Sequence, residues 1–309
     1  MIILNIVWVV IGTVLLLWGA DRFTDGACGV ARKWHVSELV IGLTIVAFGT
    51  SLPEFVVSLF SSLRGSADMS IGNIIGSNIF NTLVIVGASC LMMKMVADKG
   101  VLLRDIPFCI VLSAILVGLG LMGQIYRWGA LILCFMFLIF MAYNMYLVKS
   151  QKDALSSTTE EMSGWRLLFL IIIGICTLVG GGQLLVNSAA ELARAFGVSE
   201  SVIGLTILAG GTSLPELATS VIAARKGSQG VALGNVIGSN VFNIAFVLGI
   251  CNLIRPMQIR DISIVDWSVM LGSCLLLWVF AFTGRRITKT EGFVLLLCYA
   301  AYLSFLLLH

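Results

Sequence analysis

Residues 49–54 read GTSLPE, and residues 211–216 read GTSLPE again. Both copies lie inside runs of Ile, Val, Leu and Phe, where a carboxylate and a helix-breaking proline are unexpected. Proline removes a backbone hydrogen-bond donor and clashes with the carbonyl four residues earlier, at a cost of about 3 kcal/mol inside a helix. The two copies therefore predict two helices that break at equivalent places.

The composition places the chain in a lipid bilayer. Of its 309 residues, 59% are hydrophobic and 11% are charged, and the mean hydropathy is +1.05. Soluble domains carry about 25% charged residues, and an apolar run of about 20 residues spans a membrane as a helix. Unbroken runs such as IVWVVIGTVLLLW do not alternate as the strands of a transmembrane β-barrel do. We therefore expect an all-α membrane protein.

Hydropathy and the charged residues between the apolar runs predict ten transmembrane helices. They are expected at residues 4–22, 36–62, 69–93, 106–123, 127–147, 165–186, 198–224, 230–254, 265–283 and 291–308. The first helix lacks a preceding basic segment and a small-residue cleavage site, so we expect it to be retained rather than removed as a signal peptide.

The chain is two copies of one unit. When it is shifted by 162 residues, positions 41–81 align without a gap on 203–243, with 23 identities in 41 positions. Each copy holds five predicted helices, an odd number, so the second copy must enter the membrane from the opposite side. This is the inverted repeat of secondary transporters. We expect two inverted five-helix repeats, at 1–148 and 165–309, joined by a cytoplasmic linker at 149–164.

The basic residues predict how the helices are oriented. With alternating crossings, 14 of the 19 Lys and Arg residues fall on the side of the linker. Lys and Arg are enriched in cytoplasmic loops, so we expect both termini to lie outside the cytoplasm. The net charge of +3 follows from this distribution and requires no nucleic acid to explain it. The five basic residues on the side of the termini are Arg64, Arg127, Arg194, Arg255 and Arg260.

Glu54 and Glu216 directly follow the two prolines. A break in a membrane-spanning helix persists where it lines a cavity or is buried in protein. A carboxylate at the centre of the bilayer costs about 2.5–3.5 kcal/mol on insertion scales. Because both glutamates occupy the same repeat position beside the same break, we interpret them as functional residues rather than packing residues.

A second duplicated motif adds a polar stripe. It reads GNIIGSNIFN at 72–81 and GNVIGSNVFN at 234–243. Its asparagines and serine recur every four residues, which places them along one face of a helix, and its glycines permit close helix contact. The stripe alone fits either interhelical hydrogen bonding or a binding site. Its duplication beside the glutamates favours the wall of one shared cavity.

These motifs supply donors of a single chemical kind. Carboxylates, Thr and Ser hydroxyls, amide oxygens and carbonyls freed by proline are all hard oxygen ligands. Ca²⁺ takes 6–8 such oxygens, whereas soft transition metals prefer Cys or His. Two glutamates contribute a charge of −2, which one Ca²⁺ or several Na⁺ neutralise. A cavity that binds either one Ca²⁺ or several Na⁺, but not both at once, predicts a cation exchanger.

These residues resemble the α-repeats of the Na⁺/Ca²⁺ exchangers in the Ca²⁺/cation antiporter superfamily, over essentially the whole chain. The resemblance implies a central site between the second, third, seventh and eighth helices, with the first and sixth helices sliding to alternate access. It implies Na⁺ and Ca²⁺ as transported ions, with the two glutamates bridging Ca²⁺. The ion ligands that it implies are Ala47, Thr50, Ser51, Glu54, Ser77 and Asn81 in the first repeat, and Ala209, Thr212, Ser213, Glu216, Ser239 and Asn243 in the second.

One position departs from part of that family. Some relatives, including the K⁺-dependent branch, have Asp where this chain has Asn243. Without a third carboxylate, we expect that K⁺ is not co-transported. The linker is too short for a regulatory domain, which suggests a protein of a prokaryotic inner membrane.

Three other functions compete with this prediction. An H⁺/Ca²⁺ antiporter of the same fold would use the two glutamates to carry protons, but the hydroxyls of GTS suit Na⁺ better. A cation channel would use the same oxygens, although a duplicated, charge-balanced cavity favours alternating access. An enzyme is not supported: the eight cysteines form no CxxC pair, and the predicted helices hold no Ser/His/Asp set. We expect no cofactor and no obligatory protein partner.

Overall fold

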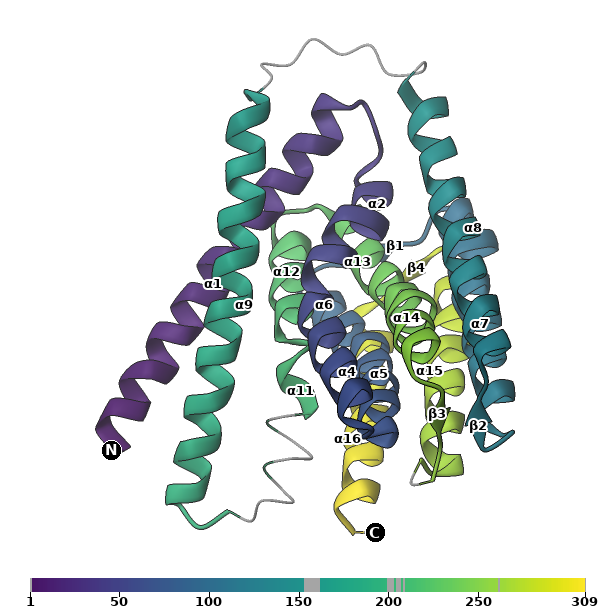
Figure 1. Ribbon diagram of the computed structural model, residues 1–309. Helices are drawn as coiled ribbons and strands as arrows, with labels where there is room; N and C mark the ends of the chain where they lie inside the picture. The colour runs from purple at the N-terminus through teal and green to yellow at the C-terminus, as the bar shows by residue number, and fades with distance from the viewer. Residues whose placement is uncertain are drawn as a thin grey trace.

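The computed structural model describes residues 2–152, 162–198, 203, 207, 209–260 and 262–308. Within these residues the protein is almost entirely helical (Figure 1). The α-helices are α1 Ile2–Lys33, α2 Glu38–Ile41, α3 Ala47–Thr50, α4 Leu52–Arg64, α5 Ala67–Phe80, α6 Val86–Met92, α7 Ile106–Gly120, α8 Arg127–Lys152, α9 Gly164–Ala195, α11 Ala209–Gly211, α12 Leu214–Arg225, α13 Gln229–Val241, α14 Gly249–Ile254, α15 Ile264–Phe282 and α16 Lys289–Leu308. Short π-helical segments extend several of them: η1 Gly42–Val46, η2 Asn81–Ile85, η3 Val101–Asp105 and η5 Phe242–Leu248.

Nine membrane crossings can be recognised among the described residues. Eight helical stretches are long and apolar enough to cross alone, and the ninth is the pair Glu38–Thr50 and Leu52–Arg64, bent by 48°. These nine correspond to nine of the ten predicted helices, which confirms the all-helical architecture. The remaining one, at 198–224, lies partly outside the described residues, and α11 and α12 cover its second half. The count of ten stays a prediction.

The long helices α1 and α9 lie side by side at one flank of the bundle (Figure 1). Their backbones approach closely because glycines line the contact. A Cβ atom added to Gly181 would lie 2.6 Å from the amide nitrogen of Leu16, and one added to Gly174 would lie 2.7 Å from that of Phe23. No side chain fits there, so the two helices pack backbone to backbone, as small residues allow in membranes.

Helix α1 is longer than predicted. The polar residues after position 22 were expected to end it, but it continues to Lys33. The reason is a partner distant in sequence: Nζ of Lys226 lies 2.6 Å from carboxylate oxygens of both Asp21 and Asp25. Partial burial on its own lowers the pKa of Lys226, but the hydrogen bonds and charges of the two aspartates raise it above the usual lysine value. The cluster therefore stays charged and ties α1 to the end of α12.

Two short antiparallel pairings join the halves of the chain. Strand β1 (Met95–Val96) pairs with β4 (Arg286–Ile287), and β2 (Gln124–Ile125) pairs with β3 (Met257–Gln258). The shift of 162 residues relates β1 to β3 and β2 to β4. Each pairing thus joins one strand from each half, and the two pairings are equivalent under the repeat.

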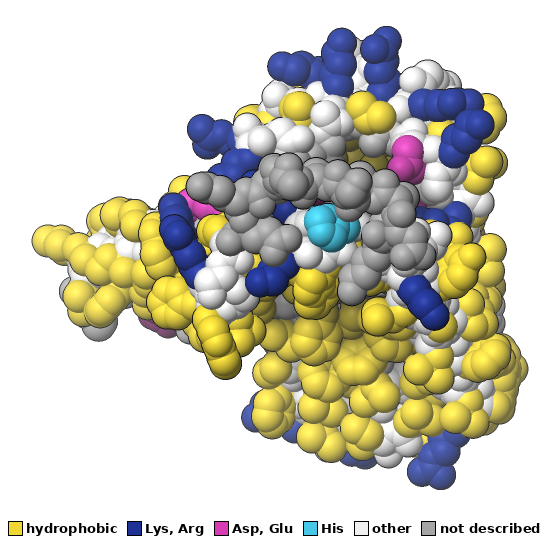
Figure 2. All heavy atoms as spheres, turned by 90° about the horizontal axis from the view of Figure 1, so that it is seen from above, with side chains coloured by type: hydrophobic (Ala, Val, Ile, Leu, Met, Phe, Trp, Pro, Cys, Tyr) yellow, Lys and Arg dark blue, Asp and Glu magenta, His cyan; other side chains and the backbone are white. Residues whose placement is uncertain are grey.

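The surface fits a bilayer. The sides of the bundle are covered by exposed apolar side chains, and Lys and Arg gather around the end seen from above in Figure 2. Both ends of the described chain lie at the opposite end of the molecule (Figure 1). This is the distribution of apolar and basic residues expected of a protein that crosses a membrane.

The contact between α1 and α9 can be tested with a single methyl group. Gly174→Ala should destabilise the protein by about 1–3 kcal/mol, because its Cβ must displace backbone atoms rather than a flexible side chain. Gly118→Ala in α7 is the control, since a Cβ there meets no described atom within 4 Å. Thermal melting in detergent measures both; equal melting temperatures would contradict the close approach.

Candidate cation site

The first helix break lies at Ser51, between α3 and α4. Ser51 leaves the helical conformation, with φ −82° and ψ 7°, and Pro53 occupies the first turn of α4. Proline fits there because the first amide groups of a helix need no internal acceptor. Glu54 follows in the same turn, where the partial positive charge of the helix N-terminus favours a carboxylate.

The second break repeats this geometry. Ser213 has φ −88° and ψ 7° and lies between α11 and α12, with Pro215 in the first turn of α12 and Glu216 after it. Both breaks predicted from the duplicated GTSLPE motif are therefore present. The matching dihedral angles show that the motif encodes the local geometry in both halves.

The two glutamates are held by serines of the opposite half. Oγ of Ser213 donates to Oε1 of Glu54 at 3.0 Å, and Oγ of Ser51 donates to Oε1 of Glu216 at 3.0 Å. Ser77, on α5, lies 3.5 Å from the same oxygen of Glu54. Both glutamates are fully buried. The breaks thus converge, and each half contributes a hydroxyl to the carboxylate of the other.

Four buried oxygens at this site lack a hydrogen-bond partner among the described residues. They are Oε2 of Glu54, Oε2 of Glu216, Oδ1 of Asn81 and Oδ1 of Asn243. A buried acceptor left unsatisfied costs about 1–3 kcal/mol, and more when it is charged. Within the described chain no Lys, Arg or His forms an ion pair with either glutamate. The arrangement is suited to a cation.

Asn73 of α5 supports the first glutamate through the backbone. Its Nδ2 donates to the carbonyl oxygen of Glu54 at 3.4 Å and to Oγ of Ser58 at 3.0 Å. Its Oδ1 accepts a hydrogen bond from Oγ1 of Thr212 at 3.4 Å. Asn73 therefore connects the first turn of α4 to the second break.

Asn235 does the same in the second half. It donates to the carbonyl oxygen of Glu216 at 3.3 Å and to Oγ of Ser220 at 2.9 Å, and it accepts from Oγ1 of Thr50 at 3.0 Å. No role was predicted for Ser58 or Ser220 from the sequence. Their identity at equal repeat positions was the signal that could have found them.

The other predicted site residues are placed as follows. Ser239 is fully buried, with its Oγ 3.5 Å from Oγ1 of Thr50. The carbonyl oxygen of Ala47 accepts from the amide of Ser51 at 3.1 Å and lies 3.4 Å from Oγ1 of Thr50, so it already has hydrogen-bond partners within its own helix. Ala209 is the first residue of α11. Asn81 opens η2 and Asn243 lies in η5, π-helical segments of the kind often found at functional sites.

The donor set is made of hard oxygens. Among the described residues, no group of three or more His, Cys, Asp or Glu side chains comes together. Two carboxylates, hydroxyls and amide oxygens remain, which suit Na⁺ and Ca²⁺ better than a transition metal.

A cavity of about 970 Å³ reaches this site from one side. It lies between α4, α5, α9 and the segment before α12, and Asn73 and Thr212 line its inner part. Met69, near the start of α5, also lines it. The start of α5 lies toward the end of the molecule that holds both ends of the described chain (Figure 1), so the cavity has lining residues both beside the breaks and near that end.

The equivalent surface toward the opposite end is closed. A Cβ added to Gly234 would lie 2.6 Å from the carbonyl oxygen of Leu39, and one added to Gly238 would lie 2.7 Å from the backbone of η1. Their repeat counterparts, Gly72 and Gly76, line the cavity of about 970 Å³. The counterparts of Leu39 and Leu43, at positions 201 and 205, lie outside the described residues.

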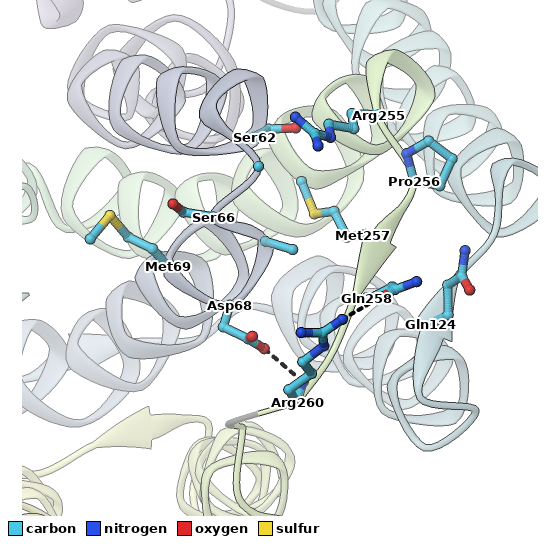
Figure 3. A pocket seen from close by; sticks show the side chains of 12 residues that line it. Ser62, Ser66, Asp68, Met69, Gln124, Arg255, Pro256, Met257, Gln258 and Arg260 are labelled. Carbon is cyan, nitrogen blue, oxygen red and sulfur yellow. Dashed lines mark hydrogen bonds between the residues drawn. The ribbon is translucent and has the colours of Figure 1, made fainter.

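A second cavity, of about 660 Å³, adjoins the first at Met69 (Figure 3). Arg255 and Arg260 line it, and the amide of Arg260 donates to Oδ1 of Asp68 at 2.9 Å. Nη2 of Arg260 donates to Oε1 of Gln258 at 2.8 Å. Two guanidinium groups and one carboxylate make this space unsuitable for a cation. Neither of the paired glutamates lines it.

The chain resembles known proteins over nearly its whole length. The sodium/calcium exchanger protein family matches residues 4–146 and 166–308. CaxA of Alkalimonas amylolytica is 38% identical over 308 residues, covering 96% of each chain. The sodium/calcium exchanger MaX1 of Methanosarcina acetivorans is 32% identical over 347 residues, covering 98% of each chain. The solved structure of the sodium-calcium exchanger NCX_Mj, at 32% identity, matches with a TM-score of 0.87 and covers 98% of this chain and 99% of that one.

Because the carboxylates are buried, Glu216→Gln should change the melting temperature in opposite directions with and without a bound cation. In cation-free buffer, Glu216→Gln should raise the melting temperature, because it removes a buried charge. Saturating Ca²⁺ should reverse the order. At 100 times its dissociation constant, a ligand stabilises the wild type by about 2.7 kcal/mol, whereas the variant should gain little. Glu191→Gln, on the exposed face of α9, is the control and should follow the wild type in both buffers. A melting temperature of Glu216→Gln that stays above the wild type in Ca²⁺ would mean that this glutamate binds no cation.

Proposed function

The chain belongs to the sodium/calcium exchanger family, and we propose that it is a secondary active antiporter that exchanges Na⁺ for Ca²⁺ at Glu54 and Glu216. One observation carries the proposal: Ser213 donates a hydrogen bond to Glu54, and Ser51 donates one to Glu216. The second oxygen of each carboxylate has no hydrogen-bond partner among the described residues. One Ca²⁺ bridging the two glutamates would neutralise both charges. Several Na⁺ ions in adjacent positions would do the same.

The proposed ligand set follows the duplicated motifs. Hydroxyls, amide oxygens and backbone carbonyls complete the coordination that the carboxylates begin, and most of these groups are buried around the glutamates. The proposed ligands are Ala47, Thr50, Ser51, Glu54, Ser77 and Asn81 from the first half, and Ala209, Thr212, Ser213, Glu216, Ser239 and Asn243 from the second.

We propose that the chain is two inverted five-helix repeats, at 1–148 and 165–309, with ten crossings. Three features support this: the reciprocal Ser–Glu contacts, the equivalent strand pairings, and the opposite directions of α4 and α12 in Figure 1. The proposed linker at 149–164 lies mostly outside the described residues, and α8 reaches Lys152 within it.

We place the protein in the cytoplasmic membrane of a prokaryote, with both termini outside the cytoplasm. The excess of Lys and Arg on the linker side supports this orientation, and MaX1 and CaxA come from an archaeon and a bacterium. In this orientation the cavity that reaches the site opens to the outside.

Na⁺ is the proposed counter-ion rather than H⁺. Four hydroxyls of the two GTS segments surround the carboxylates, and hydroxyl oxygens coordinate Na⁺ directly. Asn81 and Asn243 add neutral oxygens, so no third carboxylate is present at these positions to hold K⁺ or carry a proton. The tight packing of α13 against α2 and η1 also argues against a cation channel, since it closes the route on the second side.

Ca²⁺ uptake into proteoliposomes tests the proposal. With Na⁺ inside and none outside, the wild type should accumulate radioactive Ca²⁺, and removing K⁺ should not reduce the rate. Glu54→Gln and Glu216→Gln should each lower uptake by at least 100-fold, since each removes half of the negative charge that binds Ca²⁺. Glu191→Gln should retain wild-type uptake.

Two outcomes would redirect the assignment. Uptake that follows an imposed pH gradient and ignores Na⁺ would establish the H⁺/Ca²⁺ antiporter. Ion currents that far exceed the turnover of a transporter would establish a channel.

A further inference from the structure

Four buried asparagine side chains form a network across the repeat, two from each half of the chain. Asn81 and Asn243 are proposed ligands, whereas Asn78 and Asn240, three residues earlier in each half, have no role so far. All four are at most 2% exposed. We propose that Asn78 and Asn240 are positioning residues, which hold the amide oxygens of Asn243 and Asn81 toward the transported cation. This proposal rests on the proposed function.

Asn78 fixes the orientation of Asn243. Nδ2 of Asn78 donates to the backbone carbonyl oxygen of Asn240 at 3.3 Å, and a carbonyl oxygen only accepts. Oδ1 of Asn78 must therefore point the other way, where it accepts from Nδ2 of Asn243 at 3.0 Å. Because its Nδ2 is engaged, Asn243 turns its Oδ1 away from Asn78. That oxygen is one of the four buried acceptors without a partner in the described part of the chain.

Asn240 fixes Asn81 in the same way. Oδ1 of Asn240 accepts from Nδ2 of Asn81 at 3.2 Å, and Nδ2 of Asn240 donates to Oγ1 of Thr82 at 2.9 Å. Oδ1 of Asn81 is again left without a partner among the described residues. Each ligand is thus oriented by an asparagine of the opposite half, as each glutamate is held by a serine of the opposite half.

An amide ligand needs such a device because its two ends are unlike. The oxygen attracts a cation, whereas the NH₂ group carries two positively polarised hydrogens and repels it. The two ends have nearly the same shape, so packing alone distinguishes them poorly, and a hydrogen bond to the NH₂ group is what selects one orientation. A carboxylate has two equivalent oxygens and needs no such selection. The neutral ligands of this chain therefore depend on Asn78 and Asn240.

The test measures Ca²⁺ affinity of the full-length protein in detergent by isothermal titration. Asn78→Ala should weaken Ca²⁺ binding by about 10–100-fold, the usual effect of removing a group that orients a metal ligand. The control is Asn252→Ala. Asn252 is also buried and accepts from the amide of Met257 at 2.8 Å, but it lies outside the network. Its removal should lower the melting temperature and leave the Ca²⁺ affinity within about twofold of the wild type.

The decisive comparison repeats Asn78→Ala in an Asn243→Asp background. A carboxylate at position 243 needs no orienting partner. In that background Asn78→Ala should therefore weaken Ca²⁺ binding by less than about threefold. A purely structural role of Asn78 would cost the same in both backgrounds, and that result would overturn the proposal. Because binding is the readout, a wild type that binds Ca²⁺ but does not exchange it for Na⁺ would refute the proposed function alone.

Thr82→Val provides a second test that does not depend on the folding of Asn78→Ala. Valine has the shape of threonine but cannot accept from Nδ2 of Asn240, so Asn240 is less firmly oriented. Thr82→Val should therefore lower the Ca²⁺ affinity. In an Asn81→Asp background the same substitution should leave the Ca²⁺ affinity unchanged, because a carboxylate needs no orienting partner. An unchanged affinity in Thr82→Val would overturn the role of Asn240.

Discussion

Two buried carboxylates that form no ion pair with a described side chain are the constraint on which the rest of the structure depends. Moving a charge out of water is costly unless hydrogen bonds or an opposite charge offset it. Here the offset is partial. Helix breaks place Glu54 and Glu216 in the first turns of α4 and α12, and serines occupy one oxygen of each. The second oxygen of each glutamate has no partner among the described residues, and under the proposed function the transported cation supplies it.

Every element of the site is shared between the two halves of the chain. The serines, the asparagines and the strand pairings each join one half to the other, so neither half holds a complete site. In the second half, α13 packs closely against α2 and η1 of the first half, so this contact too joins the two halves of the chain.

Much of this could be predicted from the sequence. Composition indicated helices in a membrane, and the duplicated motifs located both breaks and both buried glutamates. Prediction failed where a residue depends on a partner distant in the chain. The first helix was predicted to end at residue 22, but α1 continues to Lys33, and Lys226 forms ion pairs with Asp21 and Asp25 within it. The two-residue strands carry no periodic signal, and the roles of Asn78 and Asn240 become visible only from their contacts across the repeat.

The sharing of the site also sets an order of events during synthesis. Ser213, which donates to the carboxylate of Glu54, follows it by 159 residues. At about 5–20 residues per second, the ribosome needs roughly 8–32 s to reach it. Helix α9, the partner of α1, is complete before Ser213, whereas strands β3 and β4, the partners of β2 and β1, follow after it. The two halves can therefore begin to pair through α1 and α9 while Glu54 still lacks the serine that holds it.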